Sequence, residues 1–392
     1  MPKELSKTLG KFRTGIFQEL TEKYHSLLSR GETVYNLYVG TPDLLPDRRV
    51  TAAVAAAAAD PENYKYSIVE LPALKKALID YYKKRYGVEL DPDAITATNG
   101  TQDSMAHIGI ALCNKGDLVM IPDPGYPVFE SGVLFSEADP YYYQLLEKNN
   151  YLLDFESVPE DVWQRTKYIV TSYPSNPCGA LAPKEFYVKL IEYAKKYGFY
   201  IVNDNVYSDI IFDGSEGFSF LSIEGAKDVG IEFFSLSKSF NLTGARISFA
   251  LGNKRLVDAM KVIRSQYDFG MFTPIQYGAI AALTECADSL TVGEEYKRRK
   301  EAFCSGMRRI GWNIPDSKGT MFIWAPIPKG YSSCMEFWQA LADKAGIICA
   351  PGTAFGPSGE GYVRFALIHP VEVIEELVGK VDKAGIIKKG DE

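Results

Sequence analysis

The segment Ser235–Arg246 places a lysine among hydroxyl side chains and an arginine eight residues after that lysine. Lys238 could form a Schiff base with a carbonyl compound if burial or neighbouring cations lowered the pKa of its amine. The arginine, Arg246, and the hydroxyl groups could bind a phosphate. The alternative is a solvated surface loop, because most lysines lie at the surface of a protein. These residue types therefore suit amine chemistry next to a phosphate.

Two more motifs carry polar side chains just after predicted strands. Asn176 lies in the turn Tyr173–Gly179, at the strand end where open α/β sheets bind ligands. Asp204 lies at the end of another predicted strand, and its carboxylate could bond a protonated ring nitrogen, with Tyr207 in reach of a phenolic oxygen. The alternatives are an Asn-Pro turn without a ligand and an aspartate that caps the next helix.

The turn Asn99–Asp103 lies between a predicted strand and an apolar helix. Its backbone N–H groups and the Thr101 hydroxyl could bind a phosphate at the N-terminus of that helix, although many strand–helix turns share this composition. An aromatic residue, Tyr126 in the segment Pro122–Pro127, follows a further predicted strand. Its ring could stack on a planar cofactor or could belong to the core.

Arg364 lies within a predicted strand, between apolar neighbours. A buried arginine normally has an anionic partner. That partner is either the carboxylate of a substrate, bound through two parallel hydrogen bonds, or a carboxylate of the protein in a structural ion pair.

Helix and strand patterns alternate around these motifs, which predicts an α/β fold. Five short apolar runs without alternation are typical of strands buried on both faces of a parallel sheet. We expect a large domain over residues 46–290, with a mostly parallel sheet between helices, and a smaller α+β domain from residues 1–45 and 291–392. The apolar runs are Leu118–Ile121, Tyr168–Thr171, Tyr200–Val202, Glu232–Leu236 and Ile247–Leu251.

Apolar residues at helical spacing predict helices, and glycine or proline marks several of their ends. The first helix has no sheet neighbour nearby in the sequence and could join the smaller domain, whose two strands flank a helix. The predicted helices are Phe12–Leu28, Leu71–Tyr81 with Gly87 beyond it, Pro183–Tyr197 before Gly198, and Thr291–Arg309, and the two strands are Met321–Ala325 and Tyr362–Ala366.

The composition excludes several classes of protein. The chain has 392 residues, a formal net charge of −7 and 46% hydrophobic residues, so we expect neither disorder nor nucleic-acid binding. The longest apolar run, Ala52–Ala59, is too short to cross a membrane, and the N-terminal sequence has no apolar secretion-signal region. Six cysteines without CxxC spacing and three scattered histidines do not support a metal site. We therefore expect a cytoplasmic protein without a metal.

In this combination and order, the motifs resemble the class I pyridoxal 5′-phosphate (PLP) aminotransferases of fold type I, from about Tyr35 to Leu367. Several segments look most similar to the LL-diaminopimelate aminotransferase branch. They read PDPGYPVF, DNVYSDIIFDG, SLSKSFNLTGARI and GMFTPIQYGAIAAL. The chain departs from that branch at Gln102, where its members tend to have lysine, and after Arg264, where Ser-Gln-Tyr-Asp-Phe-Gly replaces an Asn/Ser-rich run.

The resemblance implies that the motifs bind PLP within the large domain. Lys238 corresponds to the lysine that holds PLP as a Schiff base, and Asp204 to the carboxylate on its pyridine nitrogen. Tyr207 and Asn176 correspond to the pair that bonds the phenolic oxygen of the ring, and Tyr126 to the aromatic that stacks on the ring. The residues that correspond to the phosphate-binding set are Gly100, Thr101, Gln102, Ser235 and Arg246.

The resemblance also implies where the substrate and a second subunit bind. Arg364 corresponds to the arginine that binds the α-carboxylate of the substrate, and Gly40 and Asn176 line the same position. Tyr66 corresponds to the tyrosine that reaches the phosphate in the partner subunit, which implies a homodimer with shared active sites. The sequence shows no second arginine for a distal substrate carboxylate, although Arg264 or a residue of the partner chain could serve.

The implied activity is transfer of an amino group from an L-amino acid to a 2-oxo acid by a ping-pong mechanism. Diaminopimelate-type, aspartate-type and aromatic substrates all fit this reading. A β-eliminating C–S lyase would share nearly all the PLP-binding residues and is the alternative within PLP chemistry. A regulator of this shape without turnover would carry an additional DNA-binding domain, whereas few residues precede the matched region here. A phosphate-binding enzyme without PLP would be colourless and would tolerate replacement of Lys238.

Overall fold

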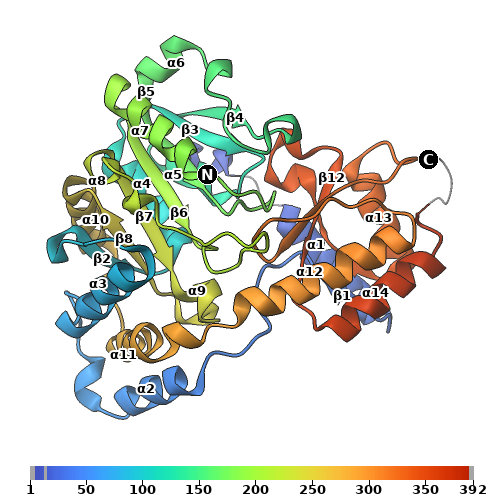
Figure 1. Cartoon of the computed structure of the whole chain (residues 1–392), viewed down its shortest axis with the longest axis horizontal. Coiled ribbons are helices and arrows are strands. Elements are labelled where there is room, and N and C mark those ends of the chain that lie inside the picture. The colour runs from blue at the N-terminus through green and yellow to red at the C-terminus, as the bar shows by residue number, and fades with distance from the viewer. Residues whose placement is uncertain (1–4, 13–15, 388–392) are drawn as a thin grey trace, which may run out of the picture.

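The computed structural model describes residues 5–12 and 16–387. Residues 1–4, 13–15 and 388–392, which belong to the predicted smaller domain, lie outside the described residues. Three sheets organise the described chain, a mixed sheet of seven strands, an antiparallel sheet of three and a parallel pair (Figure 1). This arrangement confirms the α/β fold class.

The seven strands of the large sheet lie in the order β2-β8-β7-β6-β5-β3-β4. Neighbours from β7 to β4 are parallel, which confirms the mostly parallel sheet. The edge strand β4 is largely exposed, so its sequence shows no continuous apolar run and was not among the predicted strands. The strands are β2 (Ile95–Thr98), β3 (Leu118–Asp123), β4 (Asp139–Gln144), β5 (Thr166–Ser172), β6 (Tyr200–Asn205), β7 (Gly230–Ser235) and β8 (Ser248–Gly252).

Strand β8 runs antiparallel to both of its neighbours, so the parallel direction expected for the run Ile247–Leu251 is wrong. Ser235 at the end of β7 lies opposite Ser248 at the start of β8, and the chain between them forms the short helix α9 (Leu236–Ser239). Because no crossover takes the chain back to the other end of the sheet, β8 must return antiparallel.

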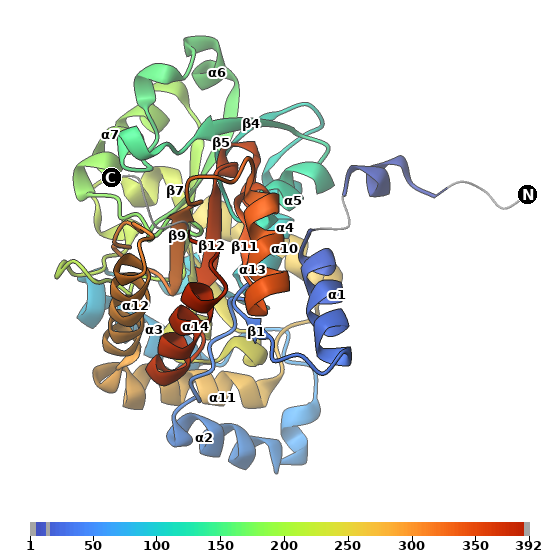
Figure 2. The same ribbon diagram turned by 90° about the vertical axis from the view of Figure 1, so that its right-hand side faces the viewer.

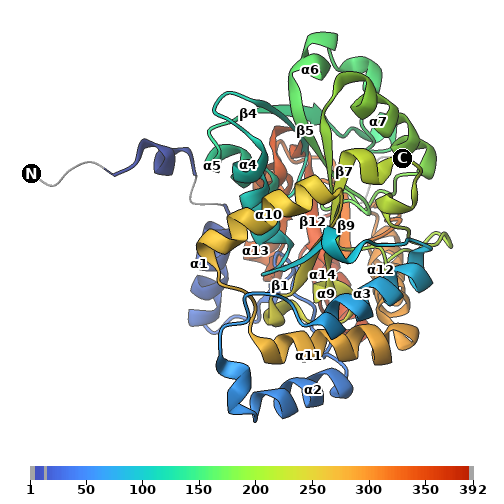
Figure 3. The ribbon, with the colours of Figure 1, turned by 90° about the vertical axis from the view of Figure 1, so that its left-hand side faces the viewer.

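Helices cover both faces of the large sheet. Three of them enclose a separate apolar core on one face (Figure 3), namely α4 (Thr101–Leu112), α5 (Val128–Phe135) and α10 (Lys254–Tyr267). Those on the other face are α3 (Pro72–Tyr86), α6 (Glu160–Arg165), α7 (Lys184–Tyr197) and α8 (Ala226–Val229). The helices α2 (Arg48–Ala58) and α11 (Thr273–Ala281) pack against each other (Figure 1).

Two predicted helix ends are confirmed by backbone geometry. Helix α3 ends at Gly87, with φ of 67°, and α7 ends at Gly198, with φ of 79°. Both values lie in the left-handed region, which glycine adopts without the steric cost of a Cβ atom. Pro183 occupies the N-cap position of α7 without a side-chain cap hydrogen bond, and its missing N–H costs nothing at a helix start.

A smaller unit is built from segments near both ends of the described chain. Strand β1 (Tyr35–Asn36) pairs in parallel with β10 (Ile347–Ile348). Helix α1 (Ile16–Ser29) lies beside α13 (Figure 2), where Lys23 Nζ is 2.7 Å from Asp343 Oδ1. The domain limits at residues 45 and 291 stay a prediction. The other elements here are β9 (Phe322–Pro326), β11 (Ala350–Pro351), β12 (Tyr362–Ala366), α12 (Val292–Arg309), α13 (Cys334–Ala345) and α14 (Val371–Lys383).

Neither a membrane crossing nor a metal cluster is found in the part of the chain that the structure describes. None of its helices combines the length and the apolar character that a membrane crossing requires. The same residues contain no group of three or more His, Cys, Asp or Glu side chains placed to hold a metal ion.

Candidate functional site

A cavity of about 650 Å³ lies between the carboxyl ends of the large-sheet strands and the small antiparallel sheet. Strands β5, β6 and β7 are parallel neighbours, so the polar residues that follow them meet at one edge. All the predicted site residues except Gly100 and Tyr66 line this cavity. Those that line it are Gly40, Thr101, Gln102, Tyr126, Asn176, Asp204, Tyr207, Ser235, Lys238, Arg246 and Arg364.

Lys238 lies on the short helix α9, directly after β7. The Ser235 hydroxyl accepts a hydrogen bond from the Ser237 N–H at 3.1 Å, which caps this helix. The Lys238 amine donates to the Gly40 carbonyl. Burial lowers the pKa of the Lys238 amine to about 7, and the positive charges of Arg364 and Arg246 act in the same direction. A substantial fraction of this amine is therefore neutral and nucleophilic near pH 7.

Asp204 lies near the end of β6, and only 8% of its surface is exposed. Its Oδ2 atom is 3.5 Å from the Ser172 hydroxyl, whereas Oδ1 has no hydrogen-bond partner among the described residues. Burial raises the pKa of this carboxyl to about 7, and the charge of Glu232 adds to the effect. The next helical element begins only at Phe220, so Asp204 caps no helix. Asp204 lines the cavity, and its Oδ1 atom lacks a donor among the described residues.

Arg364 on β12 is 2% exposed, and no ion pair among the described residues includes it. Its Nη1 donates to Asn176 Oδ1 and its Nη2 to the Tyr38 carbonyl, both at 2.8 Å, while Nε has no partner. Its guanidinium lies 4.0 Å from the centre of the Phe322 ring. Burial lowers the pKa of Arg364 to about 10. The structural ion pair is therefore ruled out within the described chain, and the buried charge lacks an anion.

Another part of the cavity brings Arg246 to the start of α4. Gly100 precedes that helix with φ of 96°, and a Cβ atom on it would lie 2.1 Å from Arg246 Nη2. A side chain at position 100 would displace the Arg246 guanidinium, and the φ value itself favours glycine, although Gly100 does not line the cavity. Arg246 Nη1 donates to the Thr243 carbonyl at 3.0 Å. A cation, a helix N-terminus and the Thr101 hydroxyl therefore lie together, which is a set that binds phosphate.

The two aromatic candidates also reach the cavity. Tyr207 is buried, and its ring packs edge-on against Phe322 at 5.8 Å between ring centres. Burial raises the pKa of Tyr207 and of Tyr126 above the ordinary range, so both phenols are neutral hydrogen-bonding groups at pH 7. Tyr126 packs edge-on against Phe129 at 6.1 Å.

Besides Gly100, two residues named from the sequence lie outside the cavity. Tyr66 is 84% exposed, and its ring is 5.6 Å from that of Phe269. Arg264 is buried between two carboxylates, with Nη1 3.1 Å from Glu70 Oε1 and Nε 2.9 Å from Asp268 Oδ2. The suggestion that Arg264 could bind a distal substrate carboxylate is therefore wrong for its own subunit, because both of its faces are already occupied.

Half of the residues that line the cavity were not found from the sequence, and Phe17, Thr21, Tyr38 and Phe322 are the clearest cases. Phe17 and Thr21 come from α1, and the Thr21 hydroxyl lies 2.9 Å from the Tyr38 hydroxyl. Phe322 begins β9 and closes the cavity beside Gly40, where a Cβ atom would lie 2.6 Å from its ring. The α1 sequence carries only an ordinary amphipathic pattern, which contains no signal for a ligand.

Comparisons with known proteins agree with this geometry. The sequence model of the family described as aminotransferase class I and II matches residues 32–381. The LL-diaminopimelate aminotransferase of Dehalococcoides mccartyi is 38% identical, over 96% of this chain and 98% of that protein. The LL-diaminopimelate aminotransferase of Aquifex aeolicus is 39% identical over the same shares. Among solved structures, substrate-bound BacF from Bacillus subtilis superposes with a TM-score of 0.92 at 31% identity, over 97% of this chain and 98% of that one.

Proposed function

The chain belongs to the class I and II aminotransferases, which depend on PLP, and we propose that it moves the amino group of LL-diaminopimelate to a 2-oxo acid with PLP held by Lys238. One observation carries the proposed site. Asp204 Oδ1 is buried against the cavity without a hydrogen-bond partner in the described chain, and a protonated pyridine nitrogen is a donor that would satisfy it. The donor amino acid is proposed from the two relatives, which match nearly the whole chain.

The residues present fit the three reactive parts of PLP. The start of α4 and Arg246 suit its phosphate, the amine of Lys238 suits its carbonyl carbon, and the carboxylate of Asp204 suits its ring nitrogen. When bound, PLP withdraws electrons from the Cα atom of the substrate through its protonated ring. A cation next to Asp204 favours the carboxylate form, so Asp204 would hold the proton on the ring nitrogen.

Lys238 and Arg364 have separate tasks in this proposal. The Lys238 amine, with a pKa of about 7, can accept the proton of the substrate Cα and donate it again in the return half of the cycle. Arg364 donates one N–H to Asn176 and one to the Tyr38 carbonyl. Its Nε–H and one further N–H on each Nη remain for the α-carboxylate of the substrate.

The neutral part of the cavity favours a substrate whose distal end has no net charge. Among the described residues that line the whole cavity, the charged ones are Asp204, Lys238, Arg246 and Arg364, and the rest of the lining is uncharged. The distal end of LL-diaminopimelate carries one ammonium and one carboxylate, which hydroxyl groups such as those of the Thr21–Tyr38 pair can bind. The rings of Phe17 and Phe322 make an aromatic amino acid the second candidate donor. Aspartate fits less well, because a lone distal carboxylate needs a cation.

We also infer a homodimer with shared sites from the exposed apolar surface around Tyr66. Ile68, Val69 and Phe269 are each at least 60% exposed, and the rings of Tyr64 and Phe272 lie 5.4 Å apart in the same region. Such a patch normally marks an interface. In the dimer, Tyr66 would reach the phosphate bound by the partner subunit. The cytoplasmic location expected from the sequence belongs to this proposal as well.

The test is a visible absorption spectrum of the PLP-loaded protein before and after single amino acids are added. We expect the band of the bound cofactor to be lost with LL-diaminopimelate and to return with a 2-oxo acid. Loss of the band with aromatic donors alone would replace the proposed donor with the second candidate. Release of pyruvate from cystathionine without a 2-oxo acid would instead mark a β-lyase, and no band in the presence of PLP would refute the cofactor site.

A further inference from the structure

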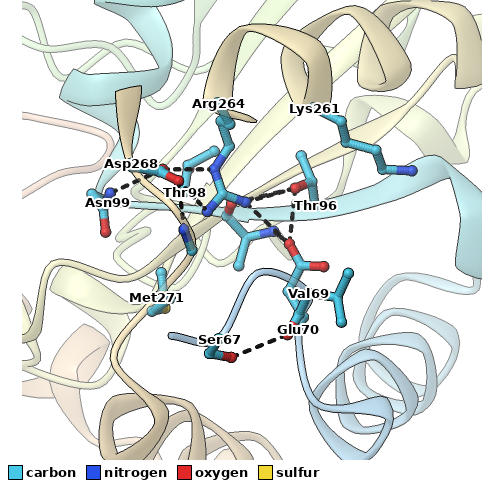
Figure 4. Close-up of polar contacts among 12 residues, drawn as sticks. Ser67, Val69, Glu70, Thr96, Thr98, Asn99, Lys261, Arg264, Asp268 and Met271 are labelled. Carbon is cyan, nitrogen blue, oxygen red and sulfur yellow. Dashed lines mark hydrogen bonds and ion pairs between the residues drawn. The ribbon is translucent and has the colours of Figure 1, made fainter. Parts of the chain in front are cut away.

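Arg264 is buried at the centre of a polar network that joins three segments of the chain (Figure 4). The residue lies in the last turn of α10 and is 6% exposed. Its guanidinium contacts Glu70 on one side and Asp268 on the other, and its Nη1 also donates to the Thr96 hydroxyl at 2.8 Å. None of these residues lines the cavity, so the network serves neither the substrate nor the cofactor directly.

The Glu70 side of the network fixes the segment that carries Tyr66. Glu70 Oε1 accepts hydrogen bonds from the Thr96 hydroxyl at 2.9 Å and from the Ala97 N–H at 2.8 Å. Burial alone would raise the pKa of Glu70, but these bonds and the charge of Arg264 hold it below its ordinary value. Glu70 is therefore a charged anchor that attaches the loop after Tyr66 to strand β2.

The Asp268 side fixes the turn before the phosphate end of the cavity. Asp268 Oδ2 accepts from Asn99 Nδ2 at 3.3 Å, and Oδ1 accepts from the Gly270 N–H at 2.9 Å. Asn99 directly precedes Gly100. At Gly270, with φ of 97°, a Cβ atom would lie 1.6 Å from the Ser67 carbonyl oxygen, so the two loops touch backbone to backbone. Asp268 thus connects the phosphate end to the Tyr66 segment.

A second contact holds the end of α10 to the first turn of α4. The Tyr267 hydroxyl donates to Asp103 Oδ2 at 3.0 Å, and the Tyr267 ring stacks on His107 at 4.0 Å between ring centres. The start of α4 is therefore held from the α10 side at Asn99 and at Asp103. A phosphate at this helix N-terminus depends on its N–H groups pointing at one place.

We propose that Arg264 is a positioning residue for phosphate binding, which holds the Asn99–Thr101 turn and the Tyr66 segment in a fixed relation through Asp268 and Glu70. The proposal rests on the proposed function, in which that turn binds the phosphate of PLP and Tyr66 that of the partner site. Arg264 would thereby strengthen binding of the phosphate group without contacting that group.

The test compares binding of PLP with binding of pyridoxal, which lacks the phosphate, by absorption titration of the apoprotein. A purely structural role would weaken both ligands equally, whereas a positioning role lowers the ratio of the two affinities. We expect this ratio to fall about tenfold in Arg264→Met and less in Arg264→Lys, which keeps the charge but not the two-sided contact. Asn99→Ala removes only the hydrogen bond between Asp268 and the Asn99–Thr101 turn, and this variant should also lower the ratio.

Arg299→Met is the matched control. Arg299 is equally buried on a helix between two carboxylates, at 2.6 Å from Asp43 Oδ1 and 2.8 Å from Glu295 Oε1, in the smaller unit. Its loss should lower the melting temperature without changing the affinity ratio.

An unchanged affinity ratio in both Asn99→Ala and Arg264→Lys would overturn the proposal even if Arg264→Met does not fold. An equal fall of the affinity ratio in the control Arg299→Met would also overturn it. A wild-type protein that binds PLP and pyridoxal equally would instead refute the proposed phosphate site.

Discussion

The amine of Lys238 donates a hydrogen bond to the carbonyl of Gly40, which lies 198 residues earlier in the chain. Lys238 follows the large sheet, whereas Gly40 follows β1, which is paired with the smaller unit. The Phe322 ring lies against Gly40 and leaves no room for a side chain on it. The reactivity of the amine is therefore set by both units together.

The first prediction concerns the pH dependence of cofactor attachment. Burial places the pKa of Lys238 at about 7, and only the neutral amine attacks a carbonyl. We expect the rate of PLP attachment to the apoprotein to rise about tenfold for each pH unit well below 7 and to level off above it. Stopped-flow absorbance between pH 5 and 10 measures this rate. A rate that kept rising to pH 10 would show an amine with an ordinary pKa.

The second prediction is that Lys238→Ala keeps PLP in the site but loses turnover. The phosphate end and Asp204 are untouched by this change, whereas the proton acceptor for the substrate Cα is gone. We expect kcat to fall by at least about 10²–10⁴-fold, the range for loss of a general base. Equilibrium dialysis for PLP and a coupled assay for the 2-oxo acid product test both halves. Retained turnover would contradict the role of Lys238.

The third prediction separates chemistry from binding at Asp204. Asp204→Asn has almost the same shape but cannot stabilise a positive charge on the ring nitrogen. We expect kcat to fall by about 10²–10³-fold, as for loss of one electrostatic contact in an active site, with a smaller change in KM. Steady-state kinetics with saturating PLP measures the changes in kcat and in KM separately. The conservative variant Asp204→Glu, which keeps the charge, is the control and should retain more activity than Asp204→Asn.

The fourth prediction concerns the stability of the apoprotein. The pKa of Asp204 is raised to about 7 in the folded state, so the folded protein binds more protons than the unfolded chain between about pH 4 and pH 7. This carboxyl therefore contributes stability at low pH that is lost as the pH rises through 7. We expect Asp204→Asn to flatten the fall in melting temperature of the apoprotein between pH 5 and 7. If plots of melting temperature against pH were parallel for the wild-type apoprotein and Asp204→Asn, the raised pKa would be contradicted.

The fifth prediction concerns substrate binding by Arg364. Arg364→Lys keeps a cation but cannot form two parallel hydrogen bonds to a carboxylate. We expect KM for the amino donor to rise by about tenfold or more while the ratio of PLP to pyridoxal affinity stays unchanged. A loss of that ratio would place Arg364 at the phosphate instead.

The residues at or just after the strand ends could be predicted from the sequence, because parallel strands end at one edge and the residues there must meet. Lys238, Asp204 and Asn176 belong to this group. The direction of β8 could not be predicted, because an apolar run has the same composition in either direction. Thr21 and Tyr38 were also missed, since their place in the cavity depends on how α1 packs, and local sequence does not encode that packing.

The hydrogen bond between Arg364 and the Tyr38 carbonyl joins residues 326 positions apart. All strands of the large sheet lie between Ile95 and Gly252, so a growing chain on the ribosome can complete that sheet well before Arg364 is synthesised. Lys238 and Asp204 are available from that moment. A nascent chain could therefore take up PLP early, while its capacity to bind the carboxylate of an amino acid waits until Arg364 has been translated.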